Sequence, residues 1–272
     1  MKNIFILLIL LTLSLFAYDD YDMDGVEDKN DKCPNSLITD LVDVNGCTTK
    51  ALVSPHHYDV IVGSSYSQVN YDTLEKTDTV SGTLQLDYYY KNISLQLATS
   101  YFNSDASSYS TKGMNDTFVA GYYAYKPSQN LSVRVGAGLL LPTYDSGLDN
   151  NNIDYVATAN LSYAMKSFNI FGGYSYTFVN DDDIDTLDTY VKYQNVNSFY
   201  GGVGFYPTVK LYMSAAYNSG DSIYEGVQTI QSASLYAYYS FDAHWFSTLS
   251  YAYGLSDSAS DHAASIRLGY YF

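Results

Sequence analysis

The last eleven residues of the chain, His262–Phe272, decide the fold, and they read HAASIRLGYYF. Counting back from the final residue, every second side chain is apolar or aromatic: Phe272, Tyr270, Leu268, Ile266 and Ala264. The side chains between them are mixed and more polar. A period of two along a whole segment predicts a β-strand with one apolar face. The length suits a tilted strand that crosses a bilayer, which needs about 9–11 residues.

This tail resembles the closing strand of Gram-negative outer-membrane β-barrels, which ends in phenylalanine after alternating apolar residues. In that family the barrel assembly machinery reads the tail as a signal. The resemblance implies such a signal at Ile266, Leu268, Tyr270 and Phe272. It also implies an outer-membrane location, with outer-membrane lipid and lipopolysaccharide as surroundings. An edge strand of a soluble β-protein shows the same alternation, so the rest of the chain has to distinguish the two.

The same alternation recurs upstream, and the breaks between segments are by turns long and short. The predicted strands are about His57–Ser67, Thr79–Tyr90, Ile93–Asn103, Asp116–Lys126, Leu131–Leu141, Asn152–Met165, Phe168–Val179, Val196–Phe205, Val209–Asn218, Val227–Phe241, Trp245–Leu255 and His262–Phe272. Long loops on one side and tight turns on the other are typical of outer-membrane barrels. The sequence therefore predicts an all-β fold, a transmembrane antiparallel β-barrel of about 12 strands over 57–272, with ten or fourteen strands as alternatives.

The composition supports this fold and argues against some partners. The chain is 47% hydrophobic and holds 32 Tyr, a residue that suits half-buried strands and membrane–water boundaries. The single Trp, Trp245, begins a predicted strand at the periplasmic boundary. A soluble β-sandwich, the competing fold, would prefer shorter strands and a Val/Ile/Leu core. Only 13 residues are Lys or Arg, so nucleic acid is not an expected partner.

The N-terminal residues 1–17 read MKNIFILLILLTLSLFA, one Lys followed by an apolar core and a small residue. This pattern predicts a secretory signal peptide. An acidic segment follows, and the predicted organisation is signal peptide 1–17, acidic N-terminal module 18–50, linker 51–56 and barrel 57–272. An even strand number places the module in the periplasm.

Residues 20–33 of the module read DYDMDGVEDKNDKC. Carboxylates occupy positions 1, 3, 5, 9 and 12 of an EF-hand-type loop: Asp20, Asp22, Asp24, Asp28 and Asp31. Gly25 stands at position 6, where the loop turns sharply, and Val26 would offer its backbone carbonyl at position 7. Ca²⁺ takes six to eight hard oxygen ligands, so the spacing predicts a calcium site. A solvated acidic linker is the alternative.

This segment, together with VDVNGC at 42–47, resembles a single thrombospondin type 3 repeat over about 30 residues. The resemblance implies a calcium-wrapped, helix-free segment held by a Cys33–Cys47 disulfide. Porins of the OmpA type place such repeats between a barrel and a peptidoglycan-binding domain, whereas this repeat precedes the barrel. Cell-wall anchoring is therefore not inferred.

The lumen of the predicted barrel collects polar side chains, among them the candidates Asp87, Arg134, Lys210 and Arg267. A charge on the lipid face at mid-bilayer would cost roughly 2–4 kcal/mol, which favours the inward placement. The predicted function is passage of small solutes, as in a porin. A plug of mutually satisfied side chains is the alternative for the lumen. The alternative function is a structural or adhesive surface protein that acts through its external loops.

The stretch 133–179 is similar to barrel proteins of the phenol-degradation meta-pathway. It shares a G-x-G-x-x-L-P-T strand end at 136–143, then a Gly/Asp loop and Tyr-rich strands. That resemblance would imply uptake of small hydrophobic compounds. The sequence contains no G-x-S-x-G, zinc-like His/Cys set or phosphate-binding loop, so the chain is not expected to be an enzyme.

Overall fold

The computed structural model describes residues 20, 22, 25–36, 42–48, 55–70, 75–144, 152–185 and 190–272. The predicted signal peptide, 1–17, lies outside the described residues. Within the described ranges the chain forms strands, turns and irregular segments but no helix. That part of the chain accordingly supplies no helix long and apolar enough to cross a membrane.

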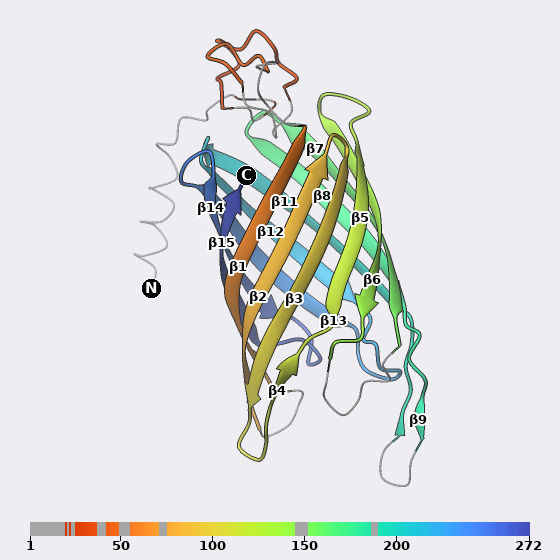
Figure 1. The fold of residues 1–272 in the computed structure, drawn as a ribbon. Helices are drawn as coiled ribbons and strands as arrows, with labels where there is room; N and C mark the ends of the chain where they lie inside the picture. The colour runs from red at the N-terminus through yellow and green to blue at the C-terminus, as the bar shows by residue number, and fades with distance from the viewer. Residues whose placement is uncertain are drawn as a thin grey trace.

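Antiparallel strands close into a single barrel, because the last strand pairs with the first (Figure 1). The sheet has 13 strands, of which β4 only extends β3, so 12 strands form the barrel wall. The wall strands are β1 (His56–Val69), β2 (Thr77–Tyr90), β3 (Ile93–Asp105), β5 (Thr117–Tyr125), β6 (Leu131–Leu141), β7 (Asp154–Met165), β8 (Phe168–Phe178), β11 (Val196–Thr208), β12 (Leu211–Gly220), β13 (Ile230–Ser240), β14 (Trp245–Gly254) and β15 (His262–Tyr271). The predicted fold class and strand number are confirmed.

Barrel closure depends on the tail that the alternation singled out. β15 pairs with β1 from Asp59 opposite Tyr271 to Gln68 opposite His262. The backbone N–H of Phe272 adds a hydrogen bond of 2.9 Å to the carbonyl of Tyr58. Closure leaves neither strand with an open edge, which satisfies every backbone group in a bilayer without water.

Three short strands lie where the sequence predicted irregular loops. β4 (Ser110–Met114) pairs with the far end of β3, and β9 (Ile184–Asp185) pairs with β10 (Tyr190–Val191). β3 is longer than the part that β5 covers, because the β3–β5 ladder ends at Ala98 opposite Phe118. β4 supplies hydrogen-bond partners to the remaining backbone of β3.

β11 continues beyond its predicted end. The sequence placed a turn at Pro207, yet β11 runs to Thr208 with a register shift between Phe205 and Thr208. Proline lacks the N–H that a ladder needs, and a bulge tolerates it inside a strand. The turn is therefore displaced to residues 209–210, and β12 begins at Leu211.

The barrel is apolar outside, the reverse of a soluble protein. Large side chains on the outward positions are strongly exposed, for example Val62 at 50%, Leu161 at 50% and Ile266 at 62%. Buried hydrophobic residues are few in the described part of the chain: Phe102, Ala120 and Ala259. An apolar surface around the whole wall is the lipid-facing band of a transmembrane barrel.

Aromatic side chains gather on the outer surface near the end of the barrel where β1 begins and β15 finishes. Trp245 packs edge-on against Tyr270 with ring centroids 4.8 Å apart, and Tyr270 packs against Phe272 at 4.7 Å. Tyr58 and Tyr88 lie 5.1 Å apart on the neighbouring strands. Such a girdle marks a membrane–water boundary.

The two ends of the barrel differ in the length of their connections. The short turns after β2, β5, β7, β11 and β13 lie at the end where β1 begins and β15 finishes. The described part of the N-terminal module lies beyond that same end, whereas β4 and β9 mark the opposite end (Figure 1).

Candidate functional site

The lumenal wall comprises the side chains that strand register turns toward the barrel interior. Asp87 on β2, Arg134 on β6 and Arg267 on β15 belong to it. Their chain neighbours Leu86, Val135 and Ile266 are 40%, 46% and 62% exposed on the outer surface. Because side chains alternate along a strand, the three charged residues face inward, as the sequence predicted for the lumen.

Lys210, the fourth lumen candidate, lies elsewhere. It occupies the exposed turn between β11 and β12, and its Nζ donates a hydrogen bond of 2.9 Å to the carbonyl of Phe241 in the next turn. The bulge at Pro207 carries β11 further than expected, which moves Lys210 out of a strand. It therefore contributes charge at the short-turn end and not on the lumenal wall.

Asp87 is the centre of a charged network and is only 7% exposed. Gln85 donates a hydrogen bond of 2.6 Å to Asp87 Oδ2. Arg267 donates to Gln85 Oε1 at 3.2 Å, from β15 across β1 to β2. Both Arg134 and Arg267 attract the Asp87 carboxylate electrostatically. One carboxylate thus lies between two guanidinium groups that approach from opposite sides along the wall.

Arg134 is anchored on the β5 side of Asp87. Its Nη2 donates a hydrogen bond of 3.0 Å to Ser94 Oγ on β3. Its guanidinium lies 3.8 Å from the centre of the Tyr122 ring, in a cation–π contact. The Tyr122 hydroxyl in turn donates to Gln96 Oε1 at 3.0 Å. The position of the charge is therefore fixed by two other strands, β3 and β5.

Inward-facing glycines allow these long side chains to lie flat along the wall. A Cβ at Gly63 on β1 would stand 2.6 Å from Arg267 Cγ, so the arginine crosses β1 only over a glycine. A Cβ at Gly136 on β6 would stand 2.2 Å from the Tyr122 ring. These contacts are shorter than van der Waals distances, so glycine at both positions keeps the side chains against the wall and out of the lumen.

The wall opposite this network is aromatic. Tyr206 on β11 lies 4.7 Å from Tyr212 on β12, measured between ring centroids. Tyr238 on β13 stacks on Phe246 of β14 at 5.4 Å. The lumen near the short-turn end thus has one ionic and one aromatic side. The polar lining that the sequence predicted describes only the ionic side.

Asp59 is a lumenal residue that the sequence reasoning missed. It lies directly opposite Asp87 in the β1–β2 pairing and is 9% exposed. Its Oδ1 has no hydrogen-bond partner among the described residues. Asp59 could have been found from the alternation of the first strand, because His57, Asp59 and Ile61 all face the interior.

A cavity of about 480 Å³ opens inside the barrel on the long-loop side of Arg134. Most of its lining is hydroxyl- or amide-bearing and faces inward, including Thr158, Asn160, Ser175, Ser198, Asn218 and Ser232. Arg134 and Tyr122 lie at its inner end, and Asp221 lies toward the long loops. No motif in the sequence indicated this cavity.

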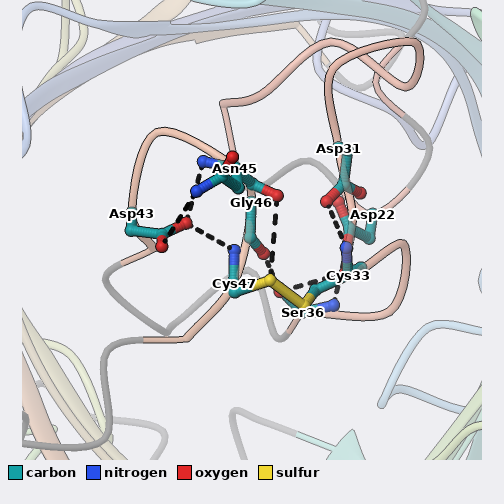
Figure 2. The surroundings of a disulfide bond; sticks show 8 residues. All are labelled: Asp22, Asp31, Cys33, Ser36, Asp43, Asn45, Gly46 and Cys47. Carbon is teal, nitrogen blue, oxygen red and sulfur yellow. Dashed lines mark hydrogen bonds between the residues drawn. A yellow bond between two sulfur atoms is a disulfide. The ribbon is translucent and has the colours of Figure 1, made fainter.

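The N-terminal module contains the Cys33–Cys47 disulfide that the thrombospondin-type resemblance implied (Figure 2). Asp43 accepts backbone hydrogen bonds from Asn45 at 2.8 Å and Cys47 at 3.1 Å. These hydrogen bonds lower the pKa of Asp43, since they favour its charged form. The backbone between Asp43 and Cys47 is thus held in a tight turn beside the disulfide.

The predicted calcium loop is described in part. Gly25 adopts a φ of +92°, as its place in a sharp turn requires, and its N–H donates to Asp20 Oδ2 at 2.9 Å. Asp22 Oδ2 accepts the N–H of Ser36 at 2.6 Å, and Asp31 Oδ1 accepts that of Cys33 at 2.7 Å. The chain therefore folds back over its own carboxylates.

The described residues of the predicted calcium loop differ in how far they are exposed. Asp31 Oδ2 is buried without a hydrogen-bond partner in the described part of the chain, which suits a cation ligand. Asp28 is exposed, and Val26 is half-buried. Asp24 lies outside the described residues, and the others form no group of three or more acidic, His or Cys side chains suited to a metal.

The four residues of the predicted assembly signal form an outward row on β15 and at its end. Ile266, Leu268 and Phe272 are 62%, 42% and 61% exposed, and Tyr270 belongs to the aromatic girdle. The row therefore lies on the outer surface of the barrel along the length of the strand.

The fold is that of known outer-membrane barrels. An outer-membrane channel from Pseudomonas putida F1 superposes with a TM-score of 0.69 at 12% identity, covering 81% of this chain and 97% of that chain. The NanC porin gives 0.51 at 16% identity over 78% and 98% of the two chains. The translocator domain of the autotransporter NalP from Neisseria meningitidis gives 0.51 at 13% over 82% and 90%. No family profile matches the sequence, and no curated protein is detectably similar to it.

Proposed function

We propose that the chain is a channel for small solutes in the outer membrane of a Gram-negative bacterium, with its N-terminal module in the periplasm. The observation that carries the proposal is the cavity of about 480 Å³ inside a closed barrel whose outer surface is apolar. An eight-stranded barrel is filled by its side chains, whereas the much wider barrels of large porins enclose an aqueous channel. This barrel, with 12 strands, is intermediate in size. The channel and porin among the structurally similar proteins fit this proposal.

The orientation in the proposal follows from loop length. Outer-membrane barrels have short turns in the periplasm and long loops outside. In this protein the short turns, the start of β1, the end of β15 and the described part of the module all lie at the same end of the barrel. The cavity then opens toward the exterior, which suits capture of a solute from outside.

Single-channel conductance of the refolded mature protein in a planar bilayer tests the proposal. Discrete and reproducible current steps are the expected result. Folding is checked first by the heat-dependent shift in gel mobility that closed barrels show. A correctly folded protein that gives no steps would refute an open channel.

A second candidate is a structural or adhesive protein that acts through its external loops. The packing of Tyr206, Tyr212, Tyr238 and Phe246 on one side of the lumen favours it, because side chains occupy space near the short-turn end. Binding of the silent, folded protein to whole cells or matrix through the long loops would support this candidate.

We also propose that the module binds one Ca²⁺ through Asp20, Asp22, Asp24, Asp28, Asp31 and the carbonyl of Val26. The turn at Gly25 and the buried oxygen of Asp31 support it. Calcium titration calorimetry of the full chain should give a Kd of about 10⁻⁴ M, typical of extracellular modules. Asp31→Asn should weaken binding, whereas Glu27→Gln, an exposed pair with Lys29, should not. Equal binding by both variants and the wild type would place the cation elsewhere.

Two partners and one solute class belong to the same proposal. The outward row Ile266, Leu268, Tyr270 and Phe272 is proposed to be read by the barrel assembly machinery, and the apolar band to contact lipid and lipopolysaccharide. The sequence similarity of 133–179 to meta-pathway barrel proteins favours small solutes. Deletion of Phe272 should reduce assembly in cells without preventing refolding in detergent.

A further inference from the structure

The ring of Tyr200 is one of two aromatic side chains of the lumenal wall, with Tyr236, that keep more than a third of their surface exposed in the described part of the chain. The register of β11 turns it inward, opposite Gly173 of β8, yet it is 36% exposed. Its exposed surface therefore faces the interior of the barrel and lines the cavity. A large ring with free surface inside a barrel is available to a solute.

A glycine and an amide hold this ring flat. A Cβ at Gly173 would stand 2.5 Å from Tyr200 Cε1, so the ring lies directly on the backbone of β8. The Tyr200 hydroxyl reaches across β8 and donates to Asn160 Oδ1 on β7 at 2.7 Å. One face of the ring is thus pressed against the wall, and the other face is left to the cavity.

Polar groups surround this platform. Asn218 donates through Nδ2 to Ser234 Oγ at 3.0 Å and makes a longer contact of 3.4 Å with Ser232 Oγ. Thr158 Oγ1 has no hydrogen-bond partner in the described part of the chain. Ser175 and Ser198 lie opposite each other on β8 and β11, both on the lumenal wall. The cavity therefore offers hydroxyl and amide groups around one aromatic face.

The two charged groups that border the cavity, Arg134 and Asp221, have opposite signs and lie at opposite ends of it. Arg134 interacts with Asp87 and donates to Ser94. Asp221 accepts hydrogen bonds from Asn197 through its backbone N–H at 3.1 Å and its side chain at 3.0 Å. A charged solute of either sign would therefore meet a like charge at one end of the cavity, and a desolvated charge without a partner is costly. The lining selects for a polar, uncharged solute.

We infer that this cavity is a binding site for a small neutral polyhydroxylated ring compound, such as a mono- or disaccharide. The C–H face of such a ring carries positive charge density and packs on the negative face of an aromatic ring. Its hydroxyls both donate and accept, which matches walls of Ser, Thr and Asn. A volume of about 480 Å³ lies within the range of small-molecule sites. This inference rests on the proposed function, since it names the solute that the channel would pass.

Titration calorimetry of the refolded full chain in detergent tests the site without requiring an open pore. The probes are sucrose, lactobionate, which is an anionic disaccharide derivative of similar size and hydroxyl content, and benzoate, an aromatic anion without hydroxyls. Saturable binding of sucrose, with lactobionate and benzoate at least tenfold weaker, is expected. Absence of sucrose binding, or tighter binding of either anion, would overturn the inference.

Variants locate the binding. Tyr200→Ala should weaken sucrose binding by tenfold or more, because the platform is lost. Tyr212→Ala is the matched control, since Tyr212 is also inward and its hydroxyl also contacts an asparagine, Asn169, at 3.3 Å. Asn218→Ala, which removes polar contacts only, should weaken binding severalfold and serves if Tyr200→Ala does not fold. Unchanged affinity in Asn218→Ala and Tyr200→Ala would refute the site.

The failure of this inference is distinguishable from that of the proposed function. Current steps in a bilayer without sucrose binding in detergent would leave the channel and remove the site. Sucrose binding in detergent with a silent bilayer would keep the site and remove the open channel.

Discussion

Asp59 and Asp87 lie directly opposite each other on β1 and β2, both turned into the lumen and both at most 9% exposed. Their surroundings are not equivalent. Asp87 has Gln85 as a donor and two arginines as counter-charges, whereas Asp59 keeps one oxygen without a hydrogen-bond partner in the described part of the chain. Like charges directly opposite each other destabilise a strand pair. The two carboxylates should therefore respond oppositely to neutralisation.

Asp87→Asn should lower the free energy of unfolding by about 1–3 kcal/mol, because it leaves Arg134 and Arg267 without their shared counter-charge. Asp59→Asn should leave stability unchanged or raise it by up to about 1 kcal/mol, because it removes the repulsion. Urea unfolding of the two variants in lipid vesicles measures the difference. Equal destabilisation by both substitutions would show that the arginines do not discriminate between the two carboxylates.

Gly136→Ala tests whether glycine keeps Tyr122 against the wall. The added Cβ would stand 2.2 Å from the ring, so the ring has to move, and a loss of about 1–3 kcal/mol is expected. Tyr122→Ala removes the obstacle, so Gly136→Ala should cost much less in that background. A double-mutant cycle in urea measures the coupling. Additive losses would mean that the glycine serves some other purpose.

The sequence predicted the fold well because a period of two carries two kinds of information. It locates the strands, and it assigns each residue to one face, the inner one for Asp87, Arg134 and Arg267. It does not say toward which neighbouring strand a side chain leans. The path of Arg267 over Gly63 exists only because the barrel closes between β15 and β1. Arg267 and the residue that it contacts, Gln85, are 182 residues apart in the chain.

The errors have local physical causes. Lys210 does not line the lumen, because Pro207 lies in a bulge of β11 and not in the turn. Tyr200 was assigned to a strand, but its exposure depends on Gly173 and Asn160, which belong to other strands. The predicted pairing of Cys33 with Cys47 was correct because the two cysteines stand within a specific sequence motif. The calcium ligands stay a prediction, and Asp24 among them lies outside the described residues.

Removal of the disulfide should affect the module and spare the barrel. Cys33 and Cys47 are 14 residues apart, and closing a loop of about that size contributes on the order of 3 kcal/mol. The Cys33→Ser/Cys47→Ser variant should therefore lose protease resistance in the module, while the heat-dependent gel shift of the barrel persists. Limited proteolysis followed by mass spectrometry locates the cleavage. Loss of the gel shift would show that the module is needed for barrel folding.

Acid should loosen the turn at Asp43 before it affects the membrane-spanning wall. Hydrogen bonds from the backbone of Asn45 and Cys47 hold the pKa of Asp43 below its ordinary value of 3.8. A carboxyl whose folded pKa is depressed contributes stability that is present above its unfolded pKa and is lost as the pH falls through its folded pKa. Protease resistance of the module should therefore be constant from pH 7 to about pH 5 and fall below about pH 4. Asp43→Asn keeps a hydrogen-bond acceptor but cannot titrate, so its resistance should be lower at neutral pH and depend less on acid. The same acid dependence in Asp43→Asn as in the wild type would assign the transition to another carboxylate of the module.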